Sequence, residues 1–223
     1  GLGDVYKRQE NNGGKVIVML NNANAMEIDE IKNNDGVDAI MEIGFPGGYG
    51  FYGVADILSG EANPSGHLTD TYAVTNANSP AAQNFGNYEW TNADPSVNIN
   101  AEEVEAEDIY TGYKYYETRY ADTVLGQGNA DATVGSSTGK AWNYDDEVSY
   151  PFGYGLSYTT FEQTLKSVDV DLANRTVTAE VDVKNTGDVA GKDVVQLYTS
   201  VPYTDYDVEN KVEKSAVQLL DYE

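Results

Sequence analysis

The chain contains no cysteine and a single histidine, His67, among its 223 residues. Disulfides, thiolate metal sites, cysteine nucleophiles and zinc sites built from several histidines are therefore excluded. A serine–histidine–aspartate triad would have to use His67. This residue follows a turn, Asn63-Pro64-Ser65-Gly66, and we interpret it as a surface or strand-entry residue. The sequence predicts no metal site and no cofactor.

Basic residues are scarce. The chain has 13 Lys and Arg against 37 Asp and Glu, a formal net charge of -24 and a pI near 4.1. Such a surface repels phosphate backbones and anionic lipid headgroups, so we expect no nucleic-acid partner. Neutral substrates such as sugars are compatible with it. No run approaches the roughly 20 apolar residues of a membrane helix. Membrane association and cellular compartment stay undetermined.

The two ends of the chain differ from its middle. The first residues, GLGDVYKRQ, contain Lys7 and Arg8 and have no helical or strand pattern of their own. They look like a translated sequencing adapter, and we interpret residues 1–14 as a non-native leader and linker. The last residues, QLLDYE, stop without a turn or a tail. We therefore expect a fragment of a longer protein.

Two strand–helix units follow the leader. KVIVML (15–20) and VDAIMEIGF (37–45) are apolar runs typical of buried strands. AMEIDEIKNN (25–34) and GFYGVADILSG (50–60) have helical spacing, and Gly60 is a candidate C-cap. One face of the second helix carries Val54, Ile57 and Leu58. This alternation predicts an α/β fold with a parallel sheet, of which part is present.

The pattern changes after a polar stretch, residues 76–150, whose segment GNADATVGSSTGK (128–140) we interpret as a mobile loop. LKSVDVDL, TVTAEVDVKN and DVVQLYTSV then alternate apolar and polar residues with a period of two. Turn residues, Ala173-Asn174 and Asn185-Thr186-Gly187, separate them. Short alternating strands divided by turns predict an antiparallel β-sandwich.

A glycine-rich stretch, FPGGYGFYG (45–53), lies between the second strand and the second helix. Its glycine spacing matches neither a Walker A loop nor a dinucleotide fingerprint. It is either a wide turn or part of a substrate site, because ligands often bind at the carboxyl edge of such sheets. The substrate-binding candidates are Phe45 and Tyr49.

Other candidate residues favour structural interpretations. The acidic run from Glu102 to Asp108 contains paired carboxylates, yet catalytic pairs need a partly desolvated pocket, so we interpret it as a solvated face. Aromatic residues in IYTGYKYYETRY predict cross-strand core packing for Tyr113, Tyr115 and Tyr116. Trp90 and Trp142 lie in polar segments where a ligand contact stays open.

The segment YPFGYGLSYTTF (150–161) is dense in aromatics and can serve as a sugar surface, a hinge or core. Pro151 holds Tyr150 extended, and Gly153 and Gly155 permit turns. Its aromatic side chains can each contribute roughly 1.5–3 kcal/mol if fully buried. We interpret it as a domain junction first and a ligand contact second.

Four segments together resemble glycoside hydrolase family 3, a family of β-glucosidase-like retaining enzymes. They are KVIVMLNNANAMEI, DAIMEIGFPGGYGFYGVADILSGEANPSGHLTDTY, IYTGYKYYETRY and VSYPFGYGLSYTTF. The most specific pieces are ADILSGEANPSG and YPFGYGLSYT. VDVKNTGDVAGKDVVQLYTSVP resembles the fibronectin type III-like domain of the same enzymes.

The resemblance implies a fold class and domain boundaries. Residues 15–160 would form part of the family's C-terminal α/β-sandwich domain, with a mainly parallel sheet, flanking helices and a long inserted loop. Residues 161–223 would form a truncated, all-β fibronectin type III-like sandwich.

The resemblance also implies a function for the intact, bacterial protein: retaining, exo-acting hydrolysis of β-linked glucosides or xylosides. The family's aspartate nucleophile lies on a separate (β/α)8 barrel, and its acid/base glutamate lies before the strand that KVIVML resembles. Neither motif is present, so no residue here is assigned to catalysis and we expect the fragment to be inactive alone. Its partners would be the missing barrel and a β-linked oligosaccharide or glucoside. A stand-alone carbohydrate-binding or structural module is the alternative, and sugar, linkage, module order and oligomeric state stay open.

Overall fold

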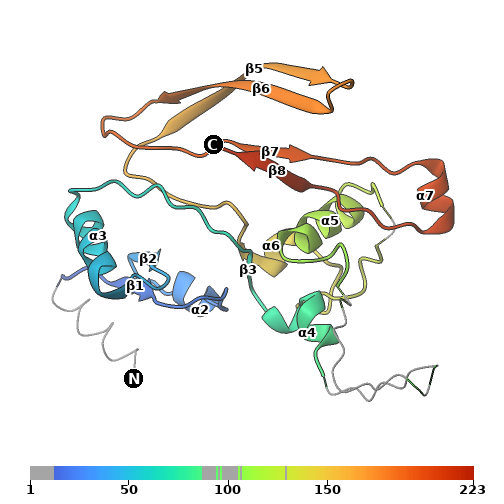
Figure 1. Cartoon of the computed structure of the whole chain (residues 1–223). Helices are drawn as coiled ribbons and strands as arrows, with labels where there is room; N and C mark the ends of the chain where they lie inside the picture. Colours follow the sequence, from blue (N-terminus) through green and yellow to red (C-terminus); the bar gives the residue numbers. More distant parts are fainter. Residues whose placement is uncertain (1–12, 87–93, 95, 97–104, 106, 129) are drawn as a thin grey trace.

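The computed structural model describes residues 13–86, 94, 96, 105, 107–128 and 130–223. Helices and small sheets alternate in the first two thirds of the chain, and strands dominate the last third. Figure 1 shows α2, α3, β1 and β2 grouped at one side and α4 to α7 at the other. Within the described ranges no helix is long and apolar enough to span a membrane.

The first sheet is a parallel pair. Strands β1 (Ile17–Leu20) and β2 (Ala39–Glu42) pair with Ile17 opposite Ala39. Helix α2 (Asp29–Lys32) connects them, and α3 (Gly47–Ser59) follows β2. Gly60 ends α3 with a φ of 82°, and its N–H donates to the carbonyl of Ile57. The predicted strand–helix order and the Gly60 cap are confirmed.

The two strands are less buried than predicted. Ile17 and Met19 keep 43% and 48% of their surface exposed. The side that is buried packs Leu20 against Ile28 and Tyr72, which are 2% and 5% exposed. The prediction of fully buried strands is wrong for the described chain, because a two-stranded sheet has no further elements to cover its second face.

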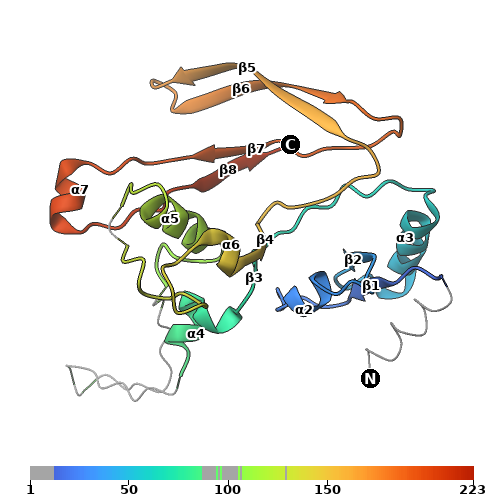
Figure 2. The same cartoon turned by 180° about the vertical axis from the view of Figure 1, so that it is seen from behind.

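A second unit surrounds a short antiparallel pair, β3 (Tyr72–Ala73) with β4 (Val148–Tyr150). Its helices are η1 (Asn76–Asn78), α4 (Pro80–Asn84), α5 (Tyr113–Thr123) and α6 (Tyr144–Glu147). Figure 2 shows α5 and α6 lying beside β3 and β4. The buried cluster of this unit contains Ala73, Tyr115, Tyr116, Trp142 and Val148.

The tyrosine-rich segment is a helix rather than a strand. Tyr115 and Tyr116 of α5 are 9% and 7% exposed, and their rings meet edge to face at 4.9 Å. Their core packing was predicted correctly, but the strand assignment was wrong. A strand would have placed adjacent residues on opposite faces, whereas on α5 both reach the core.

Trp142 also belongs to the core. It is 3% exposed, its ring lies 5.5 Å from the Arg119 guanidinium, and its backbone N–H donates to the carbonyl of Ala132. Trp142 lies in a loop, as the sequence indicated, but it is buried in the core, so the expectation that left it open to a ligand contact is wrong. Trp90 lies outside the described residues.

Hydrogen bonds from Arg119 of α5 and to Glu147 of α6 attach the inserted loop before Trp142 to these two helices. Arg119 donates to the carbonyls of Asp131 and Val134 at 3.1 and 2.5 Å. The Ser137 amide donates to the buried carboxylate of Glu147 at 2.6 Å. A cation and an anion of the core each satisfy backbone groups of this loop, and the mobility expected from its sequence stays a prediction.

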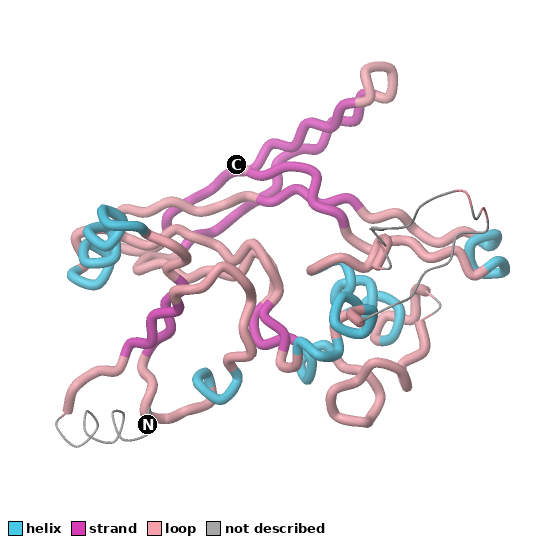
Figure 3. Tube along the Cα trace, turned by 60° about the horizontal axis from the view of Figure 1, so that its bottom comes forward, coloured by secondary structure: helices cyan, strands magenta, loops and turns pink. Residues whose placement is uncertain are grey.

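The last third forms two hairpins. Strand β5 (Phe161–Asp171) pairs with β6 (Thr176–Asn185), with a bulge between Leu165 and Ser167. Strand β7 (Gln196–Thr199) pairs with β8 (Gln218–Tyr222), and α7 (Asp205–Asn210) lies between them. Figure 3 shows the long β5–β6 hairpin projecting from the rest of the chain. The predicted alternating strands and their turns are confirmed.

The segment between β4 and β5 makes several contacts with earlier elements of the chain. The Phe152 ring stacks on Tyr113 at 4.4 Å. Leu68 pairs by backbone hydrogen bonds with Gly153 and Tyr154, both at 2.8 Å. The residues following β4 are thus fixed to α5 and to the loop after α3.

Asn63 ties the same segment to the hairpins. Its side-chain oxygen accepts from the Ser157 hydroxyl and the Tyr158 amide, at 2.9 and 2.8 Å. Its side-chain nitrogen donates to the carbonyl of Ala190 at 3.1 Å. One amide therefore links three separate loops.

Two side chains of helix α5 form hydrogen bonds with the backbone at β8. The Ala216 amide donates to the Thr118 hydroxyl at 3.0 Å, and Thr118 is fully buried. The Leu219 amide donates to the Tyr113 hydroxyl at 2.9 Å. The backbone groups that enter β8 are therefore satisfied by side chains of the preceding unit.

Gly155 generates a stability prediction. A Cβ there would lie 2.4 Å from the Gly66 carbonyl oxygen and 3.0 Å from the His67 ring. We expect Gly155→Ala to lower the free energy of unfolding by about 1–3 kcal/mol, because backbone must move to admit the methyl group. Chemical denaturation of both proteins measures this. Gly66→Ala is the matched control, since a Cβ there meets nothing within 4 Å; equal effects of the two variants would contradict the prediction.

Candidate functional site

A cavity of about 280 Å³ lies where β1 and β2 end. Its walls come from the loop after β1, residues 22–25, and from Glu42, Gly44 and Phe45 at the end of β2. Residues 67–70 and Tyr72 close the opposite side. The carboxyl ends of parallel strands are the usual location of ligands in α/β sheets. This cavity is therefore the candidate site.

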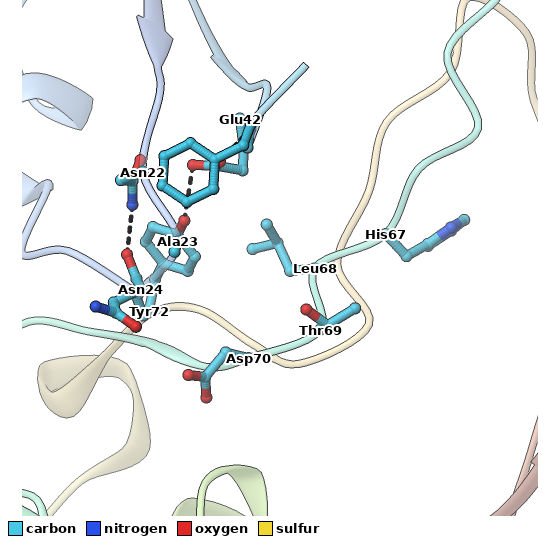
Figure 4. A pocket seen from close by; sticks show the side chains of 12 residues that line it. Asn22, Ala23, Asn24, Glu42, His67, Leu68, Thr69, Asp70 and Tyr72 are labelled. Carbon is cyan, nitrogen blue, oxygen red and sulfur yellow. Dashed lines mark hydrogen bonds between the residues drawn. The ribbon is translucent and has the colours of Figure 1, made fainter. Parts of the chain in front are cut away.

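Glu42 and Tyr72 form the central polar pair of the cavity. The Tyr72 hydroxyl donates to one Glu42 oxygen at 3.0 Å, and the Gly44 amide donates to the other at 2.7 Å. Figure 4 shows the Glu42 and Tyr72 side chains facing each other across the wall. Burial, and then the hydrogen bond to Glu42, raises the pKa of Tyr72. Tyr72 thus stays a donor, and Glu42 keeps acceptor capacity toward the cavity.

The two predicted substrate-binding residues occupy different positions. Phe45 lines the cavity and is 72% exposed. Tyr49 lies on α3, is 89% exposed and is not among the lining residues. A role in substrate binding stays a prediction for both.

His67 lines the cavity, although the sequence led us to a surface or strand-entry role. Its Nδ1 lies 3.1 Å from the carbonyl oxygen of Ser65, and Figure 4 shows its ring directed away from Glu42. No hydrogen-bonded base or nucleophile accompanies it among the described residues. Sequence reasoning also missed Glu42 and Tyr72, which lie 30 residues apart and carry no local motif.

Asp122 has the electrostatics expected of a functional carboxyl group, but it lies elsewhere. It is on α5, 5% exposed, and neither of its oxygens accepts a well-formed hydrogen bond in the described structure. Burial, with the Glu213 charge, raises its pKa to about 6, while the Ala130 amide and Arg119 oppose the shift. Perturbed carboxyl groups are candidate catalysts when they face a cleft. Asp122 instead packs against Gly128 and does not line the cavity.

The remaining acidic residues add no second site. Glu102 and Glu103 of the acidic run lie outside the described residues. Glu105 is exposed, and Glu107 and Asp108 belong to the turn before α5. In the described part of the chain no group of three or more His, Asp or Glu side chains is arranged to hold a metal ion.

Comparison with known proteins finds similarity to a single family. Residues 3–158 match the model of the glycosyl hydrolase family 3 C-terminal domain. The chain is 33% identical over 213 residues to β-glucosidase A of Butyrivibrio fibrisolvens, covering 89% of this chain and 21% of the relative. It is 32% identical over 201 residues to a β-glucosidase of Ruminococcus albus, covering 89% and 17%.

Solved structures of β-glucosidases have a similar fold over most of this chain. A β-glucosidase from Paenibacillus barengoltzii superposes with a TM-score of 0.67 at 30% identity, covering 94% of this chain and 19% of that one. A β-glucosidase from Kluyveromyces marxianus, in complex with glucose, superposes with a TM-score of 0.64 at 26% identity, covering 100% and 20%. The chain therefore spans about a fifth of the length of these proteins.

Asp122 generates a pH prediction. Its folded-state pKa of about 6 lies above the ordinary 3.8, so the folded state loses stability as pH rises from about 4 to 6. Asp122→Asn removes this titration. We expect the variant's advantage in unfolding free energy to grow by about 2–3 kcal/mol between pH 4 and pH 7, since each pKa unit corresponds to about 1.36 kcal/mol.

Denaturation of both proteins across this pH range measures the difference. Asp131→Asn is the control. Hydrogen bonds from Thr133 lower the pKa of Asp131, so removal of this carboxylate should make the variant less stable relative to the wild type as pH rises. Parallel stability–pH curves for the wild type and Asp122→Asn would show that Asp122 has the same pKa in the folded and unfolded states, and would contradict the prediction.

Proposed function

Because this chain belongs to glycosyl hydrolase family 3, we propose that it is part of a retaining, exo-acting β-glycosidase that hydrolyses β-linked glucosides or xylosides. The family match over residues 3–158 carries the proposal. The names of its relatives support it, since the similar proteins from Butyrivibrio, Ruminococcus and Paenibacillus are β-glucosidases. Their sources favour a bacterial origin.

The chemistry requires groups that this chain does not supply. Retaining hydrolysis uses two carboxylates about 5–5.5 Å apart, one as nucleophile and one as acid/base. The nucleophile motif and the acid/base loop are both absent from this sequence. We assign both carboxylates to other parts of the intact protein, the nucleophile to a (β/α)8 barrel and the acid/base to the segment that precedes residue 15.

The role of this chain is to form one wall of the active site. Phe45 offers a flat apolar surface at the cavity for a sugar face. Glu42, whose orientation Tyr72 and Gly44 fix, has free lone pairs that accept hydrogen bonds from sugar hydroxyls. Neutral, hydroxyl-rich ligands fit such a wall, because it binds through hydrogen bonds and stacking rather than through opposite charge.

The proposal also includes the two C-terminal hairpins, β5–β6 and β7–β8. We assign residues 15–160 to the α/β domain and residues 161–223 to a truncated fibronectin type III-like domain that braces it. The Asn63 amide and the α5 hydroxyls of Tyr113 and Thr118 supply the bracing contacts. The alternative, a stand-alone carbohydrate-binding or structural module, gains no support from relatives that are themselves named β-glucosidases.

Activity measurements separate the two functions. We expect the 223-residue chain to release no nitrophenol from p-nitrophenyl β-glucoside, because both catalytic carboxylates are missing. The intact protein encoded by the complete gene should turn over the same substrate. Turnover by the isolated chain would contradict the assignment of the carboxylates, and an inactive intact protein that still binds glucose would favour the binding module.

Binding measurements test the cavity wall. We expect Phe45→Ala to weaken glucose binding to the chain about three- to tenfold, the loss expected from one aromatic contact of about 0.5–1.5 kcal/mol. Titration followed by NMR measures the affinity at millimolar ligand. Phe85→Ala is the control, because Phe85 is also solvent-facing, at 89% exposure against 72% for Phe45, follows α4 and does not line the cavity. Equal affinities of the two variants would remove Phe45 from the site.

A further inference from the structure

The junction between α5 and the C-terminal strands contains a buried carboxyl group without a hydrogen-bond donor. Asp122 of α5 is 5% exposed, and neither of its oxygens accepts a well-formed hydrogen bond in the described structure. Its carboxyl group occupies the space that a Cβ on Gly128 would fill. Residues of this chain already close Asp122 off from solvent, so a part of the longer protein outside this chain cannot reach it without displacing them.

A second carboxylate, Glu213, exerts its charge on Asp122 from residues 200–217, which join β7 to β8 and which we call the β7–β8 segment. Glu213 accepts hydrogen bonds from the hydroxyl of Tyr110, in the turn before α5, and from that of Tyr203 at 3.4 Å. Burial is the main cause that raises the pKa of both tyrosines, so they stay uncharged donors near neutral pH. We call Asp122 and Glu213 the carboxyl pair.

The cations near the carboxyl pair are engaged with other groups. Arg119, one turn before Asp122 on α5, donates from its guanidinium group to the carbonyls of Asp131 and Val134. Lys214 of the β7–β8 segment forms its ion pair with Asp207. When both members of the carboxyl pair are ionised, two like charges therefore act on each other in a partly desolvated place. Such an arrangement favours the uptake of a proton.

Repulsion within the carboxyl pair acts across the boundary between α5 and the β7–β8 segment. At this boundary the Ala216 amide donates to the buried Thr118 hydroxyl at 3.0 Å, and Figure 1 shows α5 beside the chain that leads from α7 to β8. The inserted loop also packs near Asp122, but hydrogen bonds from Arg119 and to Glu147 attach it to the helices. The β7–β8 segment, which carries one of the two charges, is therefore the part that repulsion would displace.

We propose that the carboxyl pair makes this junction sensitive to protons: the β7–β8 segment is held against α5 while Asp122 is uncharged and is loosened when both carboxyl groups are ionised. A protonated Asp122 no longer repels Glu213, and its hydroxyl is a hydrogen-bond donor. Burial, with the Glu213 charge, raises the pKa of Asp122 to about 6. The junction is therefore tighter at pH 5 than at pH 7.5, because its opening releases a proton that the closed state retains at low pH.

Amide hydrogen exchange of the 223-residue chain, followed by NMR at pH 5 and pH 7.5, tests this. The protection factor of the Ala216 amide reports contact across the junction. We expect it to fall about tenfold from pH 5 to pH 7.5, the change calculated for a carboxyl group with a pKa of about 6 when the junction is closed and 3.8 when it is open. The amide of Trp142, which donates to the Ala132 carbonyl in the inserted loop, and the amides of β6 should change less.

Three variants separate the carboxyl pair from other titrating groups. Asp122→Asn should abolish the pH difference at Ala216. Glu213→Gln should reduce it to about threefold or less, because it removes one charge and leaves an acceptor for Tyr110. Asp131→Asn is the matched control: its carboxylate accepts hydrogen bonds from Thr133, so the tenfold difference should remain. Far-UV circular dichroism verifies each fold, and Glu213→Gln keeps the test decisive if Asp122→Asn does not fold.

Four results would overturn the proposal. The first two are equal protection of Ala216 at both pH values in the wild type, and an undiminished pH difference in folded Asp122→Asn or Glu213→Gln. A larger change at Trp142 than at Ala216 would place the opening in the inserted loop. An equal change at the amides of β6 would show that the whole chain opens rather than the β7–β8 segment.

Discussion

The Tyr72–Glu42 contact is the interaction on which the arrangement of the candidate site depends. Tyr72 is 5% exposed in the core with Leu20 and Ile28, and it also pairs with Tyr150 between β3 and β4. Its hydroxyl reaches Glu42 at the end of β2. One side chain thus joins the parallel pair, the antiparallel pair and the cavity wall. Because β1 and β2 form an isolated pair in the described chain, their position relative to the rest depends on such side-chain contacts more than on sheet hydrogen bonds.

Side-chain contacts also position the two C-terminal hairpins. The β5–β6 and β7–β8 hairpins share no strand pairing in the described residues, so their placement rests on side chains that capture backbone groups. Asn63 acts at one end of the junction, and Thr118 and Tyr113 act at the other. Net hydrogen-bond contributions are about 1 kcal/mol each, whereas an unsatisfied buried partner costs more. These contacts therefore specify the arrangement of the parts more than they stabilise it.

The sequence was sufficient for features that depend on local pattern. Apolar runs located β1 and β2, helical spacing and Gly60 located α3, and period-two alternation located β5 and β6. It failed where tertiary contacts decide. Trp142 lies in a polar segment, yet it is buried in a cluster with residues such as Ala73 and Tyr116 from distant segments, and Arg119, 23 residues earlier, lies over its ring. Tyr115 and Tyr116 suggested a strand because their aromatic composition favours strands, and core packing of helix α5 prevailed over it. Glu42 lines the same cavity as His67 and Tyr72 although it comes from a distant segment, so periodicity carried no signal of their proximity.

Charge distribution separates the candidate site from the rest of the chain. With a formal charge of -24, solvent-exposed carboxylates dominate the surface and their mutual repulsion opposes compaction. The stretch from residue 43 to residue 55 is free of charge and rich in aromatics and glycine, which costs helix stability at Gly48 and Gly53 without a packing benefit in the described structure. Core packing within the described chain does not account for these exposed rings, and solubility would be better served by charge. Because the chain spans about a fifth of the length of its relatives, the exposure of this surface reflects the described chain alone and not its surroundings in the longer protein.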